Sequence, residues 1–324
     1  MPNKQLWIKI KDILLKVMKL ARKVNPFTKE RIMLCFQYIK RSWKSIAIIL
    51  PLILFAYYSI GGYVTNSINK DTSAQINLPS EGLAVIKAGA DLIKNEVDDN
   101  MWTPNLPFIF PGYVLDNMPA YQTGVLEAVK YSVKAFNDTY NSAELSNAYE
   151  LLKYPPNVWI LSKEKDLSLA PSSGAQYRKA RKELLKFNES YEFAAADDVK
   201  LQTKLLKTIE KHLKKVSKNL ANQVLEFSSD WVDFNADSTF YNAQGCIYGN
   251  YILLKSMMAD FKSNIVNEKQ YDKYTSVLKT MEDALALNPL IIRNGEEESV
   301  MSANHLTALN YYVTKSLYQL SNLQ

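Results

Sequence analysis

Hydrophobic residues are most concentrated between Ile46 and Val64, where IAIILPLILFAYYSIGGYV contains no charged side chain. As a helix this segment extends roughly 28 Å, at about 1.5 Å per residue, close to the thickness of a bilayer's hydrocarbon core. Core helices of soluble proteins usually carry a polar stripe, and here the first polar groups are the hydroxyls of Tyr57 and Tyr58. We therefore predict a transmembrane helix over residues 45–64. Its apolar residues, Ile46 to Val64, are expected to contact the lipid bilayer.

A cleaved signal peptide is the other alternative to a permanent anchor. A signal peptide begins with a short basic region, whereas more than forty residues precede this span. The segment SIGGYVTNS also lacks an A-x-A cleavage pattern. We expect the span to remain in the protein.

Before the span, apolar and basic positions separate onto two faces of a predicted helix over residues 6–24. Its apolar face includes Ile10, Leu14 and Val17, and its lysines occupy the opposite arc. Basic amphipathic helices lie on anionic membrane surfaces, so we expect contact with the anionic inner leaflet. The alternative is packing against another subunit. A second helix, from Thr28 to Trp43, is predicted to lead into the membrane.

After the span, residues 65–79 are mostly polar and lack periodicity, which predicts a linker that holds the following domain off the bilayer. Residues 80–324 then show helical spacing, beginning with a helix capped by Ser80. No segment sustains a period of two. We therefore predict an all-α fold: a helical bundle of about seven to nine helices after a single transmembrane helix.

The boundaries of the later helices follow from prolines, caps and apolar spacing. Helices are predicted over residues 143–153, 174–195, 199–227, 237–266 and 271–287, and from a cap at Ser302 towards the C terminus. Within the helix over 237–266, Gly245 and Gly249 lie four residues apart. This spacing predicts close approach by a neighbouring helix.

The helix over residues 199–227 has the clearest period in the chain. Its seven-residue repeat consists of Val199, Leu206, Leu213, Leu220 and Phe227, with Ile209 and Val216 between them. Gln202 and Gln223 interrupt this seam, which favours packing within the bundle over a coiled coil with another chain. The opposite face carries Lys200, Lys204, Lys207, Lys211, Lys214, Lys215 and Lys218. This lysine stripe suits anionic lipid headgroups or wall polymer, although a solvated face is the more economical interpretation.

Residues 98–124 form the most distinctive loop. Four prolines exclude a continuous helix, and the loop is too aromatic to be left in water. It is either a recognition surface or an aromatic plug that closes one end of the bundle. The candidate interaction residues are Trp102, Phe108, Phe110, Tyr113, Asp116 and Asn117, of which Asp116 or Asn117 also caps the next helix.

Charge distribution sets the expected orientation. Residues 1–44 contain twelve Lys or Arg against two acids, which leaves 27 basic and 31 acidic residues for the remainder of the 39 and 33. Basic flanks stay on the cytoplasmic side, so residues 1–44 are predicted to be a basic cytoplasmic region and the domain to be periplasmic, at a bacterial inner membrane. Cys35 and Cys246 then lie on opposite sides and cannot pair. Cys246 is expected to be a buried free thiol.

Motifs for chemistry are scarce. The two histidines, His212 in the lysine stripe and His305, lack partners at metal-ligand spacing, and no phosphate-binding loop, dinucleotide fingerprint or G-x-S-x-G occurs. We predict no cofactor, no metal and no nucleic-acid partner. Asp98, Asp99 and Asp116 remain as candidate acids for glycan cleavage, although a helix cap explains Asp116 better.

Three segments resemble a known family. MWTPNLPF, LDNMPAYQTGVLEAV and DSTFYNAQGCIYGNYILL are similar to signature stretches of an uncharacterised bacterial family, domain of unknown function 2333. The resemblance extends from the span to the C terminus and implies a proteobacterial single-pass inner-membrane protein with a helical domain. It implies no functional residue, and the basic N-terminal extension falls outside it.

Two hypotheses follow. We favour a non-enzymatic interaction or scaffold protein that presents its helical domain to unknown envelope proteins. The alternative is an envelope hydrolase, or a glycan- or lipid-modifying enzyme, that uses acids near residues 98–116.

Overall fold

The computed structural model describes residues 26–73, 82–162, 168–191, 195–227, 233, 235–262, 265, 268–294 and 304–323. These residues are helical apart from connecting loops and one hairpin with two residues in each strand. The chain forms two compact units, Met1–Ser59 and Ile60–Gln324. The predicted basic helix over residues 6–24 lies outside the described residues.

The first described helix is α2, Pro26–Thr65. It joins the two helices predicted over residues 28–43 and 45–64 into one. Its segment Arg41–Thr65 is long and apolar enough to cross a membrane, with a mean hydropathy of 1.9 and only 6% of its most apolar stretch buried. Large apolar side chains such as Phe55, which is 73% exposed, line this segment. Such exposure is typical of a helix that faces lipid rather than a protein core.

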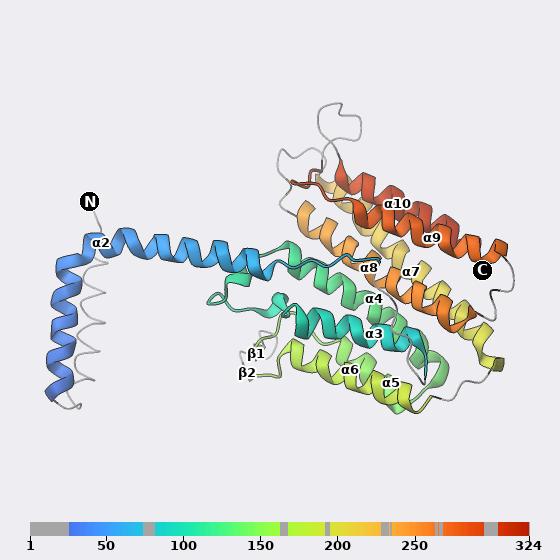
Figure 1. Ribbon diagram of the computed structural model, residues 1–324, viewed down its shortest axis with the longest axis horizontal. Helices are drawn as coiled ribbons and strands as arrows, with labels where there is room; N and C mark the ends of the chain where they lie inside the picture. The colour runs from blue at the N-terminus through green and yellow to red at the C-terminus, as the bar shows by residue number, and fades with distance from the viewer. Residues whose placement is uncertain are drawn as a thin grey trace. The chain divides into compact units, whose positions relative to one another are not determined.

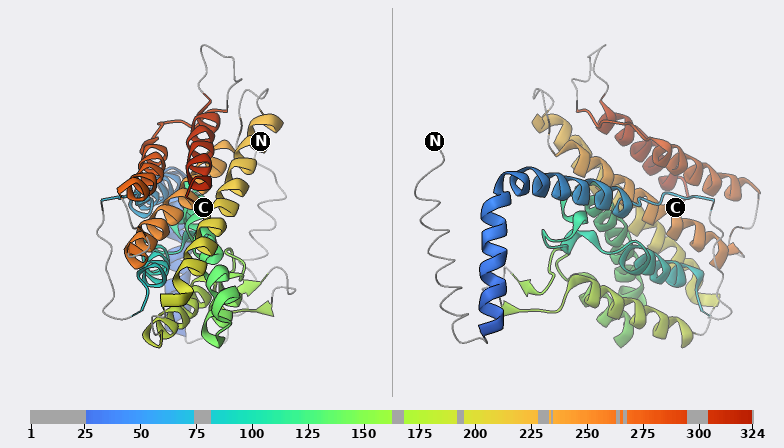
Figure 2. Two further views of the ribbon diagram at one scale, coloured as in Figure 1. Left: turned by 90° about the vertical axis from the view of Figure 1, so that its right-hand side faces the viewer. Right: turned by 60° about the vertical axis from the view of Figure 1, so that its left-hand side comes forward.

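The second unit is a helical bundle, as predicted (Figures 1 and 2). Its described α-helices are α3 (Ala84–Lys94), α4 (Asn117–Tyr140), α5 (Ala143–Leu152), α6 (Ser173–Glu189), α7 (Ala195–Phe227), α8 (Ala236–Asp260), α9 (Glu268–Ala286) and α10 (His305–Ser321). Figure 1 shows α4, α7 and α8 in the middle, with α5 and α6 on one side and α9 and α10 on the other.

Short elements connect these helices. A π-helical turn, η1 (Asn95–Asp99), extends α3, and two 3-10 turns, η2 (Thr103–Asn105) and η3 (Pro111–Val114), lie between η1 and α4. Strands β1 (Leu161–Ser162) and β2 (Ser168–Leu169) pair antiparallel, with Leu161 opposite Leu169. The hairpin lies outside the predicted pattern because two residues per strand are too few to show alternation.

The tightest helix contact joins α4 and α8. A Cβ atom at Gly124 would overlap the carbonyl oxygen of Asn242, and one at Gly245 would overlap that of Tyr121. At Gly249 an added Cβ would lie 2.6 Å from the Cβ of Ala128. The predicted close approach at Gly245 and Gly249 is thus confirmed, because these bare backbones let the two helices touch.

The seven-residue seam of α7 packs inside the domain, as predicted. Leu206, Leu213 and Leu220 are buried, and α7 contacts α4, α8 and α10. Val199 departs from the pattern, since 59% of it is exposed at the start of the helix. The interrupting Gln202 donates a hydrogen bond of 2.8 Å to the hydroxyl of Tyr274. This polar seam position is therefore satisfied by α9, and Gln223 donates to the carboxylate of Asp233 at 2.9 Å.

Helix ends use caps from distant as well as local residues. The carboxylate of Asp260, at the end of α8, accepts hydrogen bonds from the backbone N–H groups of Ala84 and Val85 at 2.7 and 2.9 Å. These two hydrogen bonds satisfy backbone donors at the start of α3. The sequence predicted Ser80 for this capping role, and Ser80 lies outside the described residues. Asn304 caps α10, and the predicted cap Ser302 is also outside the described residues.

Residues 66–73, the described part of the predicted linker over residues 65–79, are hydrogen-bonded to the domain, and the distance that the linker keeps from the bilayer stays a prediction. The hydroxyl of Tyr251 donates to the carbonyl of Thr72 at 3.2 Å, and Lys255 donates to the same oxygen at 2.9 Å. Lys70 donates to the side chain of Gln244 at 3.2 Å. Polar residues here pair with the domain rather than with water, so this segment lies along the bundle.

Candidate functional site

The aromatic loop, residues 98–124, is buried at Trp102 and exposed at Phe108 and Tyr113. Trp102 is a plug: it is 4% exposed, its indole N–H donates to the carbonyl of Pro156 at 2.8 Å, and its ring meets Tyr177 edge to face. Phe108 and Tyr113 instead are 68% and 57% exposed. The sequence does not separate these residues, because what distinguishes Trp102 is a contact with a segment fifty residues away.

One buried amide fixes the loop. Gln122 of α4 is fully buried, and its Oε1 accepts hydrogen bonds from the N–H and the hydroxyl of Thr103 at 2.9 and 2.7 Å. Its Nε2 donates to the carbonyls of Glu96 and Met101 at 2.9 and 3.0 Å. A single side chain thus satisfies buried backbone groups on both sides of the turn at Met101, which has a positive φ of 56°.

The three acids of the enzymatic alternative have structural partners. Asp98 pairs with Arg178 at 2.5 Å, and Asp99 with Lys94 at 2.6 Å. Asp116 accepts a hydrogen bond of 2.9 Å from the backbone N–H of Asn117, the first residue of α4. The prediction that Asp116 caps this helix is confirmed, and nothing in the geometry favours an acid–base pair.

We expect Asp116→Ala to lower the free energy of unfolding by about 1 kcal/mol, because α4 loses its cap. Asp116→Asn keeps an acceptor and should lose only a fraction of that. Denaturant unfolding of both variants measures the difference. An equal loss in both variants would contradict the capping role.

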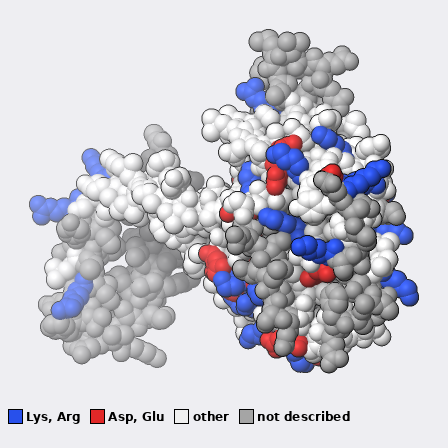
Figure 3. All heavy atoms as spheres, turned by 45° about the vertical axis from the view of Figure 1, so that its right-hand side comes forward, with Lys and Arg blue, Asp and Glu red and all other residues white. Residues whose placement is uncertain are grey.

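The lysine stripe is mostly a solvated face. Lys207, Lys211 and Lys218 are exposed, while Lys214 pairs with Glu210 at 2.5 Å. Lys215 forms an ion pair with Glu127 of α4, and Lys204 is half-buried. Figure 3 shows basic and acidic side chains interspersed over one face of the domain.

His212 was predicted to lie in this stripe, which is wrong: it is fully buried. Its ring stacks on Tyr131, with centroids 4.4 Å apart, and it meets Glu127 and Cys246 so that the three possible ligand atoms lie within 4.8 Å of one another. The cluster joins α4, α7 and α8. Its members are too far apart in the sequence for their spacing to have indicated it.

Hydrogen bonding decides what this cluster can do. Nδ2 of Asn250 donates to the carbonyl of Cys246 at 2.8 Å and to Nδ1 of His212 at 2.9 Å. In a neutral ring the proton therefore sits on Nε2, 3.9 Å from the Glu127 carboxylate, so this nitrogen is a donor rather than a metal ligand. The arrangement suits a buried polar contact better than a metal centre.

Charge and burial support that assignment. Burial raises the pKa of Glu127, but the nearby His212 ring and the ion pair with Lys215 outweigh it and bring the pKa down to about 2, so the carboxylate is ionised. Burial raises the pKa of the Cys246 thiol well above its usual range, as expected for the predicted buried free thiol. A protonated, inaccessible thiol is a poor nucleophile.

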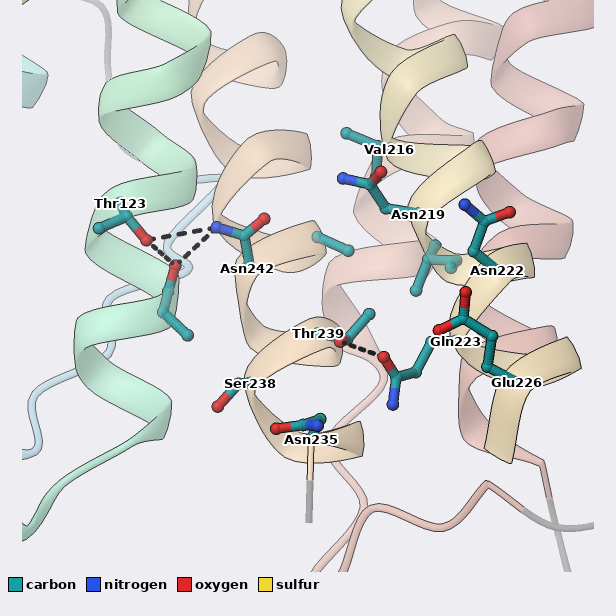
Figure 4. Close-up of a pocket in the computed structure, with 13 residues that line it drawn as sticks. Thr123, Val216, Asn219, Asn222, Gln223, Glu226, Asn235, Ser238, Thr239 and Asn242 are labelled. Atoms are coloured by element: carbon teal, nitrogen blue, oxygen red, sulfur yellow. Dashed lines mark hydrogen bonds between the residues drawn. The ribbon is translucent and has the colours of Figure 1, made fainter. Parts of the chain in front are cut away.

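An open groove of about 540 Å³ crosses α8 between α4 and α7 (Figure 4). Asn242 of α8 donates to the carbonyl of Ala120 at 3.1 Å and to the hydroxyl of Thr123 at 3.3 Å. Most of the lining side chains are uncharged: Ala120, Thr123, Val216, Asn219, Leu220, Asn222, Gln223, Asn235, Ser238, Thr239, Asn242 and Ala243. Glu226 is the one charged residue of the described lining.

Several groove side chains are available to a ligand. Asn219, Asn222 and Ser238 form no side-chain hydrogen bond with any residue that the structure describes. Sequence reasoning missed this groove. Its one local signal is that the lysine stripe ends at Lys218, after which α7 continues with uncharged polar residues facing α8.

Comparison with known proteins gave no matching family model, no matching curated protein and no matching solved structure. The resemblance to domain of unknown function 2333 therefore stays a prediction.

Proposed function

We propose that this protein is a single-pass membrane-anchored, non-enzymatic interaction component of a bacterial envelope. The apolar segment of α2 anchors it in the inner membrane with residues 1–44 in the cytoplasm, and the helical domain is periplasmic. The basic N-terminal region supports this orientation, since twelve Lys or Arg precede the span. The domain binds a segment of an envelope partner protein in the groove between α4, α7 and α8.

The composition of the groove carries this proposal. Amide and hydroxyl groups, with both donor and acceptor character, match the alternating N–H and C=O groups of an extended peptide. Open amides without a nucleophile or an acid–base pair suit binding better than catalysis.

Photo-crosslinking in living cells tests the proposal. A photoreactive amino acid at Asn222 or Glu226 should capture one defined partner, whereas the same group at the exposed Tyr318 of α10 should not. Asn219→Arg should abolish the groove crosslink by filling the groove with a long charged side chain. Capture of the same proteins at all three positions, or of this chain alone, would contradict the proposal.

The anchor requires its own experiment. A reporter that is active only in the periplasm, fused after residue 324, should be active, and the protein should stay in the membrane after alkaline extraction. An inactive fusion would overturn the orientation, and release by alkali would overturn the anchor.

A further inference from the structure

An exposed apolar surface lies beside the last turn of α2. We define the apolar platform as Phe108, Ile109, Phe110, Tyr113, Val114 and Trp159. Their exposed fractions range from 36% for Phe110 to 68% for Phe108. Phe110 and Trp159 meet edge to face with ring centroids 6.4 Å apart, so the hairpin segment joins the loop in one surface. Contiguous apolar surface of this kind marks a protein or membrane contact.

The platform is fixed to the end of the candidate span. A Cβ at Gly61 would overlap the ring of Pro111, so this proline packs directly on bare α2 backbone. One at Gly112 would lie 2.9 Å from Cγ2 of Thr65. The loop that carries the platform therefore lies at the level of residues 61–65 of the same helix.

The position of residues 61–65 along α2 indicates which environment surrounds the platform. Residues 61–65 end the apolar segment Arg41–Thr65, so they lie where hydrocarbon gives way to headgroups if α2 spans the bilayer. Residues 100–115 contain no charged side chain that would have to be removed from water. Trp159 and Tyr113 of the platform belong to the two residue types that are enriched at membrane–water interfaces.

The connection to the domain leaves little slack. Residues 66–73 follow α2 and are hydrogen-bonded to the bundle through the side chains of Tyr121, Tyr251 and Lys255. A domain joined to its anchor this closely cannot move far from the bilayer surface.

We propose that the apolar platform inserts into the interfacial region of the leaflet at which α2 ends, and so docks the helical domain on the membrane. This inference rests on the proposed membrane span. Lipid is the occupant because the platform is continuous with the lipid-facing end of α2. The second contact would restrict rotation of the domain and present its groove at a fixed height above the bilayer.

Depth-dependent fluorescence quenching of the full-length protein in lipid nanodiscs tests this proposal. Ile109→Cys in a Cys35→Ser background carries an environment-sensitive dye, and Cys246 can remain because it is 1% exposed. Lipids with a spin label near the headgroup should quench this dye several-fold more than a dye at Tyr318→Cys, an exposed position on α10. Iodide in the buffer should show the opposite order.

A variant separates insertion from mere proximity. With the dye at Tyr113→Cys, the double substitution Phe108→Asp and Ile109→Asp should remove most of the lipid quenching without changing the helical circular dichroism. The matched control, Tyr311→Asp and Tyr318→Asp, places the same charges on exposed aromatic positions of α10 and should leave the quenching unchanged.

The outcomes distinguish this inference from the proposed anchor. Strong iodide quenching at position 109 in a protein that resists alkaline extraction would overturn the platform and leave the anchor standing. Protection from both quenchers would also overturn it, because protein rather than lipid would then cover the platform. Release by alkali would remove the anchor and the platform together.

Discussion

Gly245→Ala should lower the free energy of unfolding by about 3 kcal/mol, a large effect for one methyl group. The new Cβ would overlap the carbonyl oxygen of Tyr121 and lie close to the backbone of Val125. Backbone atoms cannot rotate away as a side chain can, so α4 and α8 must separate along their contact. Loss of helical circular dichroism in denaturant, with the full-length protein in detergent micelles, measures the change.

Gly89→Ala is the matched control. Gly89 lies inside α3, and an added Cβ there would be 3.6 Å from Cγ1 of Val129, an ordinary packing distance. Alanine should therefore leave stability unchanged or raise it by up to about 1 kcal/mol through its higher helix propensity. Gly124→Ala, which meets the backbone of Asn242 from the other helix, should behave like Gly245→Ala. Equal effects at Gly89 and Gly245 would contradict the importance of the α4–α8 approach.

Local periodicity was enough to predict most of the bundle. The seam of Leu206, Leu213 and Leu220 is visible in the sequence because a helix repeats its buried positions at regular intervals. Large apolar residues at that spacing are typical of the buried face of a helix. Gly245 and Gly249 are informative for a related reason. Two glycines on one helix face destabilise that helix unless a neighbour makes use of the missing side chains.

The candidate surfaces were harder to predict because they depend on contacts between distant segments. His212 has lysines on both sides in the sequence and was placed with them, yet burial against Tyr131 and Glu127 removes it from that face. Trp102 and Phe108 are both large aromatic residues of one loop, and contacts with the carbonyl of Pro156 and the ring of Tyr177 place Trp102 in the interior. The groove is a space between three helices, and its only local sign in the sequence is the end of the lysine stripe at Lys218.

Glu96→Gln should stabilise the domain by about 3 kcal/mol at pH 8.5, where removal of a buried charge has its full effect. Glu96 lies in the π-helical turn η1 and is 1% exposed. Burial raises its pKa from 4.5 to about 7, and hydrogen bonds from Gln122 and Asn100 only partly oppose that rise. The folded state therefore binds a proton more tightly than the unfolded state does. The contribution of Glu96 to the wild-type free energy of unfolding should therefore be most favourable below pH 4.5, and it should be lost as the pH rises through 7.

The pH dependence distinguishes this cause from a simple gain in packing. The advantage of Glu96→Gln should shrink to less than about 1 kcal/mol at pH 5, because the wild-type carboxyl is then protonated and resembles the amide. Glu150→Gln is the control, since Glu150 lies on the surface and pairs with Lys153 at 2.8 Å, so its effect should stay within about 1 kcal/mol at both pH values. Denaturant unfolding of the full-length protein at pH 5 and pH 8.5 gives all the differences. A Glu96→Gln effect that is the same at both pH values would mean that Glu96 is not a buried acid that ionises near neutrality, and that the π-helical turn opens to water.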